Sequence, residues 1–345
     1  MGAFLVIVLV ITGQAPPAAA PGPTAEECLA CHAEAIEITL ADGTTHSLSL
    51  DADALEKSVH AGKATCADCH PQAREIPHPE RLFTSARQLS VAASEGCRQC
   101  HFTDYRRTLD SVHADAVARG DRMAPVCVDC HGGHDVQSPN VPRTRVAETC
   151  AKCHAGIART YAASVHGQDV AQNVADVPTC TDCHRSHAIE GPRQAGWRST
   201  TPQICGRCHG DEPLMQKYGL STNVLKTYVA DFHGKTASLR RTAGGASGEA
   251  FVAVCSDCHG THDVGRADAA ASPVLKANLA RTCQQCHEGA SARFPDSWLS
   301  HYEPSLSHAP AVYAVRLAYW FLIPFVIGGL VLQIFLHLWR VAVNR

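Results

Sequence analysis

The eighteen cysteines of this chain fall into nine C-x-x-C pairs, and a histidine directly follows each pair. Two thiols at this spacing can bond covalently to the two vinyl groups of a haem, while the adjacent histidine binds its iron from the same turn. The pattern therefore predicts nine covalently attached c-type haems. The motifs begin at Cys28, Cys66, Cys97, Cys127, Cys150, Cys180, Cys205, Cys255 and Cys283.

Zinc binding and disulfide bonding are the other uses of paired cysteines. Structural zinc takes four ligands, usually from two pairs, and nine pairs cannot be divided into twos. A disulfide scaffold is shorter and about twice as rich in cysteine. Both readings are therefore weaker than haem attachment, which also accounts for the histidine after every pair.

The predicted haem-binding residues follow directly from the nine motifs. The thioether cysteines are Cys28, Cys31, Cys66, Cys69, Cys97, Cys100, Cys127, Cys130, Cys150, Cys153, Cys180, Cys183, Cys205, Cys208, Cys255, Cys258, Cys283 and Cys286. The proximal iron ligands are His32, His70, His101, His131, His154, His184, His209, His259 and His287.

Nine of the twelve remaining histidines stand at recurring positions beside the motifs. Five are of one type, with three of them in the tripeptide Ser-Val-His and four of them ahead of a motif, and four follow a motif, usually three residues after the proximal histidine. One distal histidine for each haem would make every iron six-coordinate. The predicted distal ligands are His60, His78, His113, His134, His166, His187, His233, His262 and His301. Their spacing leaves open which of them serves which haem.

Methionine is scarce, with only Met123 and Met215 beyond the N-terminal residue. A methionine ligand raises the haem potential, so its scarcity favours low-potential haems with two histidine ligands. His308 and His337 remain as candidate ligands of a haem b shared with a partner, or as quinone-side residues. The alternative for His337 is an ordinary histidine at the membrane surface.

The motifs also repeat as pairs, in four copies of two haems with one extra motif. The chain from residue 21 to 310 is short for nine haems, so we expect the haems to form the core in place of a separate aliphatic core. The expected fold is mainly α with extensive coil and little β, built as one nonahaem domain of two-haem modules. A hairpin is expected near residues 36–50, around Asp42 and Gly43.

The N-terminal segment has the pattern of a secretory signal peptide. An apolar run at 4–11 is followed by small residues at 18–20, which predicts cleavage near residue 20. No lysine or arginine precedes the run, so an uncleaved N-terminal anchor is the alternative.

The C-terminal segment, residues 311–345, is expected to be a membrane anchor with a short tail. Twenty residues from Leu317 to Leu336 carry no charge, which is enough to cross a bilayer of about 30 Å. Arg340 and Arg345 follow this span and predict a cytoplasmic C-terminus. The expected location is therefore the inner membrane, with a single span and the haem domain in the periplasm.

The formal net charge of -3 gives no reason to expect nucleic acid binding. Two ionised propionates on each haem would add about -18, and nine ferric irons would return about +9. The haem-loaded protein is therefore expected to be strongly acidic and to favour partners with basic surfaces.

The motifs resemble those of multihaem c-type cytochromes with paired CxxCH motifs. The tail, with Trp298, His301, Pro304 and His308 before the helix and residues 336–340 at its end, resembles the membrane-anchored nonahaem-type subunit of quinone-linked cytochrome bc respiratory complexes. The resemblance implies a separate cytochrome b-type, quinone-reactive membrane subunit. It also implies transfer of electrons to periplasmic cytochromes or iron-sulfur proteins.

The leading hypothesis is an electron-transfer subunit without a catalytic substrate site of its own. One alternative is a multihaem nitrite, hydroxylamine or sulfur-oxyanion oxidoreductase, which needs an open iron position. The apparently complete set of distal histidines and the lack of a CxxCK motif weigh against it. Another alternative is a self-contained quinol dehydrogenase, although the anchor of those proteins is N-terminal.

Overall fold

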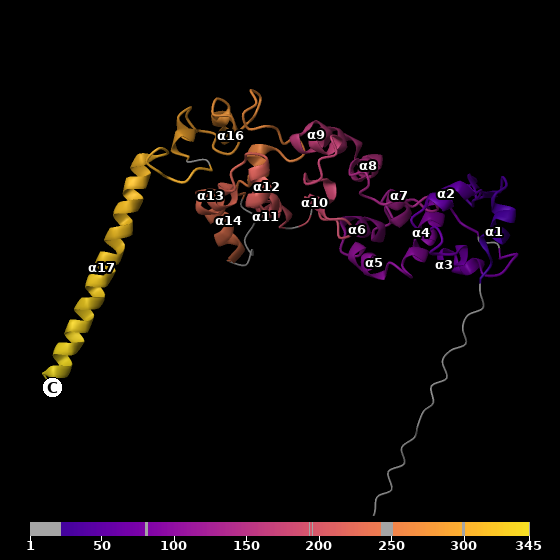
Figure 1. The fold of residues 1–345 in the computed structure, drawn as a ribbon, viewed down its shortest axis with the longest axis horizontal. Coiled ribbons are helices and arrows are strands. Elements are labelled where there is room, and N and C mark those ends of the chain that lie inside the picture. Colours follow the sequence, from indigo (N-terminus) through magenta and orange to yellow (C-terminus); the bar gives the residue numbers. More distant parts are fainter. Residues whose placement is uncertain are drawn as a thin grey trace, which may run out of the picture. The chain divides into compact units, whose positions relative to one another are not determined.

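The computed structural model describes residues 22–79, 82–192, 194, 196–242, 251–298 and 301–344, which form short helices joined by loops (Figure 1). The predicted signal segment at 1–20 and Arg345 lie outside the described residues. The chain divides into two compact units, Met1–Pro139 and Asn140–Arg345. Four of the nine motifs belong to the first unit and five to the second.

The elements of the first unit are short, and most of its motifs lie within or at the end of a helix. They are α1 (Ala25–His32), β1 (Glu37–Thr39), β2 (Thr45–Ser47), α2 (Ala52–Lys57), α3 (Cys66–Cys69), the 3-10 helix η1 (Pro71–Ala73), α4 (Ala86–Cys97), α5 (Phe102–Thr108), α6 (Val112–Ala118) and α7 (Cys127–His131).

The second unit has the longer helices. Its elements are α8 (Thr144–Ala163), α9 (Val165–Ala171), α10 (Cys180–His184), α11 (Trp197–His209), α12 (Glu212–Lys217), α13 (Asn223–Ala230), α14 (Phe232–Thr242), α15 (Cys255–His259), α16 (Leu279–Gln284), the 3-10 helix η2 (Phe294–Ser297) and α17 (Pro310–Val343).

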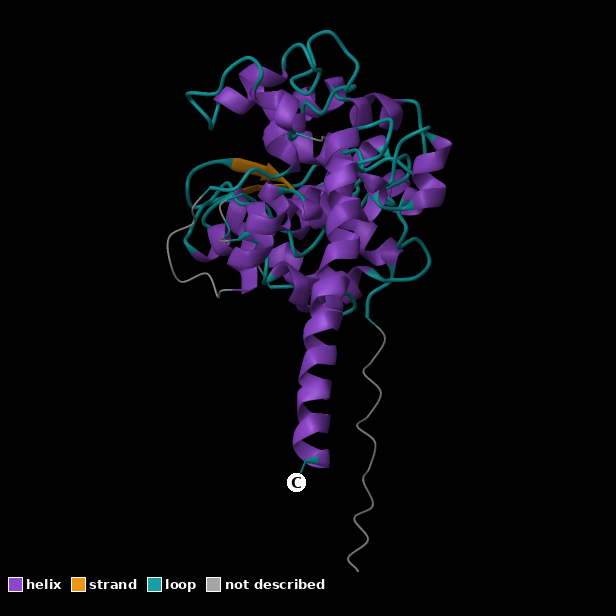
Figure 2. Ribbon diagram, turned by 90° about the vertical axis from the view of Figure 1, so that its left-hand side faces the viewer, coloured by secondary structure: helices purple, strands orange, loops and turns teal. Residues whose placement is uncertain are grey.

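The predicted hairpin is confirmed as the sheet of the described residues, drawn in orange in Figure 2. Strands β1 and β2 are antiparallel, with Ile38 opposite His46. Gly43 supplies the positive φ of 81° that the turn between them requires. The mainly helical fold with little sheet agrees with the sequence prediction.

Four of the motif helices begin with the same cap. In each CxDCH motif, the aspartate carboxylate accepts the backbone N–H of the residue before the first cysteine, at 2.6–2.8 Å. This bond satisfies one of the N–H groups that a helix start leaves without a partner. It fixes the start of a helix of only four or five residues that carries both thiols. The aspartates are Asp68, Asp129, Asp182 and Asp257.

The polypeptide has no large aliphatic core among its described residues. The buried apolar side chains are few and mostly small, and no large side chain is less than 2% exposed. Such a chain cannot gain much stability from apolar packing between its own side chains. This agrees with the expectation that a bound group supplies most of the apolar surface of the core. The buried apolar residues are Leu40, Ala67, Ala124, Val146, Val170, Val177, Met215, Val254 and Leu279.

Helix α17 is one continuous helix of 34 residues that contains the predicted span (Figure 1). At 1.5 Å per residue it is about 51 Å long, which exceeds the hydrocarbon thickness of a bilayer. Among the described residues, it is the helix that is long and apolar enough to cross a membrane by length and composition. It is compatible with a single-pass anchor.

Candidate haem-binding sites

Seven of the nine predicted distal histidines lie opposite a predicted proximal histidine of the same unit. In the first unit the ring centroids of His32 and His78 are 6.1 Å apart, those of His60 and His101 6.0 Å, and those of His70 and His134 5.9 Å. In the second unit the distances are 6.3 Å for His166 and His209, 6.0 Å for His184 and His262, 6.4 Å for His233 and His287, and 6.1 Å for His259 and His301.

This spacing fits an iron ion between two imidazoles. A metal binds an imidazole nitrogen at about 2 Å, and the ring centre lies about 1 Å further along the same line. Two such ligands on opposite sides of one iron place their ring centroids about 6 Å apart. The donor chemistry fits as well, because each pair adjoins a CxxC motif that can hold the macrocycle covalently.

The other four histidines of the predicted set are divided evenly between the units. His113 and His131 belong to the first unit, and His154 and His187 to the second. His113 lies in the first turn of α6, directly after the helix cap Ser111. His154 interrupts the helical geometry of α8, with φ of -103° and ψ of 41°.

The seven pairs follow two rules that the sequence did not reveal. A histidine in a Ser-Val-His or Asp-Phe-His tripeptide pairs with the second motif downstream, as His60 does with His101. A histidine that trails a motif pairs with a motif further upstream, as His134 does with His70. His78, which follows the motif at Cys66, accordingly faces His32 of the first motif. The trailing histidines His78, His134 and His262 therefore face a motif outside their own two-haem module, whereas His60, His166 and His233 face one inside it.

Burial keeps many of these imidazoles neutral at physiological pH. Removal from water disfavours the charged imidazolium and lowers the pKa below the ordinary value. Neutral imidazole is the form that can donate a lone pair to iron. The histidines whose pKa is lowered by burial are His70, His134, His166, His209, His259, His262 and His301.

Hydrogen bonds at Nδ1 orient several rings. His32 Nδ1 lies 3.1 Å from the Leu48 carbonyl oxygen, and His184 Nδ1 lies 2.9 Å from that of Glu190. A histidine that binds a metal commonly donates its second ring nitrogen to an oxygen in this way, which fixes its tautomer. Nε2 is then the nitrogen left to bind iron.

The serine of each Ser-Val-His tripeptide accepts a hydrogen bond from the turn that carries the predicted distal histidine. Ser58, Ser111 and Ser164 are buried, and their Oγ atoms accept a backbone N–H of the following turn at 3.1–3.3 Å. The valine of the third tripeptide joins two modules, because the N–H of Val165 donates to the carbonyl of Val264 at 2.9 Å. Val264 lies two residues beyond His262, so this bond positions two predicted distal histidines, His166 and His262, together.

The first cysteines of consecutive motifs are also in contact. Before haem is attached, the thiols of these cysteines are close enough to share a hydrogen bond, Cys28 with Cys66, Cys97 with Cys127, Cys150 with Cys180 and Cys205 with Cys255. The bond from Cys97, for example, lowers the pKa of the Cys127 thiol to about 6. The sulfur atoms that would carry neighbouring haems therefore lie against each other. Within each unit these contacts join successive motifs.

In each of three of these motif pairs, a different arginine links the two motifs. Its guanidinium binds the CxDCH aspartate and the carbonyl oxygen three residues before that motif, so two motif helices are held together. Charge-assisted pairs of this kind are about twice as strong as neutral hydrogen bonds. The three sets are Arg87 with Asp129 and Ala124, Arg143 with Asp182 and Val177, and Arg198 with Asp257 and Val252.

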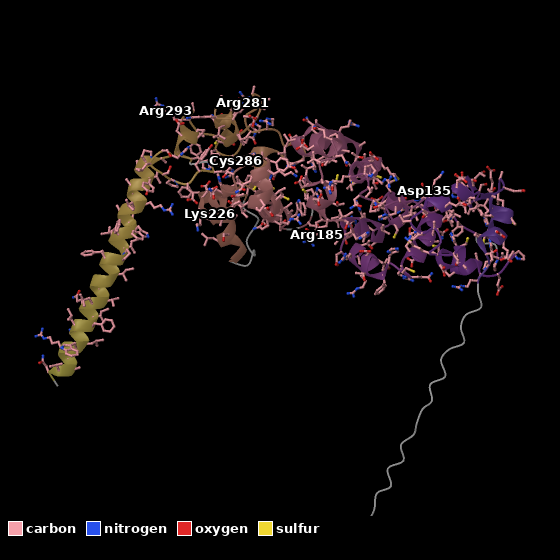
Figure 3. The ribbon with its side chains drawn as sticks, viewed as in Figure 1. Asp135, Arg185, Lys226, Arg281, Cys286 and Arg293 are labelled. Atoms are coloured by element: carbon pink, nitrogen blue, oxygen red, sulfur yellow. The ribbon has the colours of Figure 1, made fainter. Side chains whose placement is uncertain are left out.

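The residue after the proximal histidine has the same unusual backbone in three CxDCH motifs. Gly132, Arg185 and Gly260 have φ between 65° and 82° and an extended ψ, a region that residues other than glycine rarely adopt. Arg185, labelled in Figure 3, adopts it with an exposed side chain that forms an ion pair with Glu190 at 3.1 Å.

We expect Gly132→Ala to lower the free energy of unfolding by about 1–3 kcal/mol, because a Cβ is strained at this φ. That Cβ would also lie 2.6 Å from Oδ1 of Asp135. Arg185→Gly is the control and should not lower stability, because it relieves the same strain and loses one exposed ion pair. Thermal unfolding of the haem-loaded variants measures both. Equal losses in the two variants would contradict the prediction.

His308 and His337, the candidate haem b ligands or quinone-side residues, lie outside these pairs. The ring of His308 stacks on Tyr302 at 4.7 Å, and its Nδ1 lies 3.1 Å from Ser307 Oγ. It is exposed just before α17 begins. His337 is exposed on α17, near its C-terminal end. Neither position tests the prediction that these histidines bind a haem b or lie beside a quinone.

Comparison with known protein families gives one match. Residues 119–210 match the family model of cytochrome c3, and this segment contains the motifs that begin at Cys127, Cys150, Cys180 and Cys205. Searches of curated proteins and of solved structures gave no significant match. The family match supports a multihaem c-type cytochrome with covalently bound haem and a role in electron transfer.

Proposed function

We propose that this protein is a membrane-anchored periplasmic cytochrome that relays electrons through nine c-type haems. The observation that carries the proposal is the uniform spacing of the seven histidine pairs, at 5.9–6.4 Å, beside motifs whose cysteines are in contact. Haem iron with two histidine ligands exchanges single electrons at low potential.

The chain's own residues would hold the haems in place and would occupy the iron positions that a substrate could otherwise bind. Each described pair offers one imidazole to either side of an iron, so no coordination position is left for a substrate. Burial keeps many of these imidazoles neutral and ready to bind. This arrangement favours electron transfer over nitrite, hydroxylamine or sulfur-oxyanion chemistry, which requires an open position.

The membrane end supports the choice of partner. His301 lies nine residues before Pro310, the first residue of α17, so the pair formed by His259 and His301 is close to the helix along the chain. We propose that a quinone-reactive, cytochrome b-type subunit exchanges electrons at this end, and that His337 is available for a shared haem b. Periplasmic cytochromes or iron-sulfur proteins would exchange electrons with the rest of the array.

The test is purification of the full chain in mild detergent, with and without co-purifying membrane subunits. We expect nine haems per polypeptide by mass, reduction by a quinol only when the membrane subunit is present, and no turnover of nitrite with a reduced dye. Quinol reduction of the isolated chain would favour the self-contained quinol dehydrogenase. Fewer than nine haems, or rapid nitrite turnover, would overturn the relay.

The oxidised protein is expected to show two classes of low-spin iron by electron paramagnetic resonance. The pairs that contain the histidine of a Ser-Val-His or Asp-Phe-His tripeptide have ring planes tilted by 63°, 53° and 40°. The other four pairs have angles of 9° to 32°. Nearly parallel rings give rhombic spectra, and strongly tilted rings give one large g value. A single homogeneous class would contradict this expectation.

A further inference from the structure

The segment that carries His233 begins differently from the three segments that carry His60, His113 and His166. Where the others have Ser58, Ser111 and Ser164, Asp231 stands before Phe232 and His233. Its Oδ1 accepts the N–H of Phe232 at 2.5 Å. A carboxylate thus stands where the other three segments have a hydroxyl, two residues before a predicted iron ligand.

The second oxygen of this carboxylate is bound to another part of the same unit. The indole N–H of Trp298 donates to Asp231 Oδ2 at 2.6 Å, and the pair is partly buried. The Trp298 ring meets the ring of His301 edge-on, with centroids 6.0 Å apart and planes at 74°. Asp231 therefore lies between two distal histidines, His233 and His301, that belong to different haem sites.

Three further contacts link α13 to Asp231 and to the segment at residues 301–303. Thr227 Oγ1 lies 3.2 Å from Nδ1 of His301. Lys226, labelled in Figure 3, forms an ion pair with Glu303 at 2.5 Å. The N–H of Asp231 itself donates to the Thr227 carbonyl at 3.0 Å. The segment that leads into α17 is thus held against the helix pair that carries His233.

We infer that Asp231 and Trp298 form a positioning pair that sets the potentials of the two haem sites His259–His301 and His233–His287. The inference rests on the proposed function, because it assigns these sites to the membrane end of the electron path. A fixed negative charge stabilises the ferric state, which carries one more positive charge than the ferrous state, and so lowers the potential. The indole N–H offsets part of that charge and fixes its position.

The test is a spectroelectrochemical titration of the full-length, haem-loaded protein in detergent. Asp231→Asn keeps a side-chain oxygen for the cap and removes the charge. We expect it to raise the midpoint of two of the nine haems, by about tenfold in the reduction equilibrium, or about 59 mV for one electron. Trp298→Phe keeps the ring against His301 and removes the donor. It should lower the midpoint of the same two haems, the opposite sign.

Two controls separate this effect from a general change in charge or in folding. Ser164→Asp adds a carboxylate at the equivalent position of the segment that carries His166 and should lower the midpoint of the His166–His209 site alone. Asp110→Asn removes an exposed charge from the other unit and should shift neither of the two sites.

Unchanged midpoints in both Asp231→Asn and Trp298→Phe, with nine haems still bound, would overturn the inference and leave the proposed relay intact. Shifts of the same sign in both variants would overturn it as well, because a general loosening of the site would explain them. Fewer than nine haems in the wild-type protein would instead contradict the proposed function. Haem content by mass spectrometry is therefore measured on every sample.

Discussion

Replacing His166 by methionine is expected to raise the midpoint potential of one haem in nine, by on the order of 0.1 V. A thioether ligand favours ferrous iron more than imidazole does, and axial ligands are a main determinant of haem potential. His166 faces His209 at 6.3 Å, and burial lowers its pKa, so it is well placed to bind iron as a neutral ligand. Spectroelectrochemical titration of the variant measures the shift.

His46→Met is the matched control for this substitution. His46 lies in strand β2, opposite Ile38 and outside the predicted ligand set, so its replacement should leave every potential unchanged. A His166→Met protein with the wild-type titration curve would show that His166 does not bind iron. A shift in several haems at once would point to a disturbed fold rather than to a single changed ligand.

Gly167→Ala is expected to detach His166 from its site and to destabilise the protein by about 3 kcal/mol or more, because the overlap is with backbone that cannot move aside cheaply. A Cβ on Gly167 would overlap the Tyr161 carbonyl oxygen and lie 2.7 Å from its carbon. Relief of that overlap requires α9 to move away from the end of α8, and α9 carries His166. We expect a high-spin ferric signal from one haem in nine and a lower thermal midpoint.

Gly156→Ala provides the comparison within α8. No atom outside its own helix lies within 4 Å of a Cβ at this position, so alanine should raise helix stability by about 0.5–1 kcal/mol. Its ligation should be that of the wild type. If both variants behave alike, close approach at Gly167 does not position His166. A low-spin spectrum for Gly167→Ala would lead to the same conclusion.

Local patterns carried much of the prediction. The cysteines and the proximal histidine of a motif are neighbours along the chain, so five consecutive residues specify the attachment chemistry. The hairpin around Gly43 and the apolar run of α17 are likewise short-range signals, and both are present in the structure. Repetition predicted a set of nine distal histidines, and each of seven of them faces a predicted proximal histidine of its own unit.

The partners of these histidines could not be predicted, because each pair joins segments that are distant in the sequence. His78 follows one motif and faces the histidine of an earlier one. Arg198 and Asp257 are 59 residues apart, and Asp231 and Trp298 are 67 residues apart. Nothing in the local sequence indicates that these side chains meet.

The sequence by itself therefore determined which residues are fit to hold haem, since that chemistry is set by neighbours in the chain. The tertiary structure alone decided which histidine faces which, which cysteines touch, and where a single aspartate lies between two sites. Those relations arise from packing between segments distant in sequence, and the spacing of a motif carries no information about them.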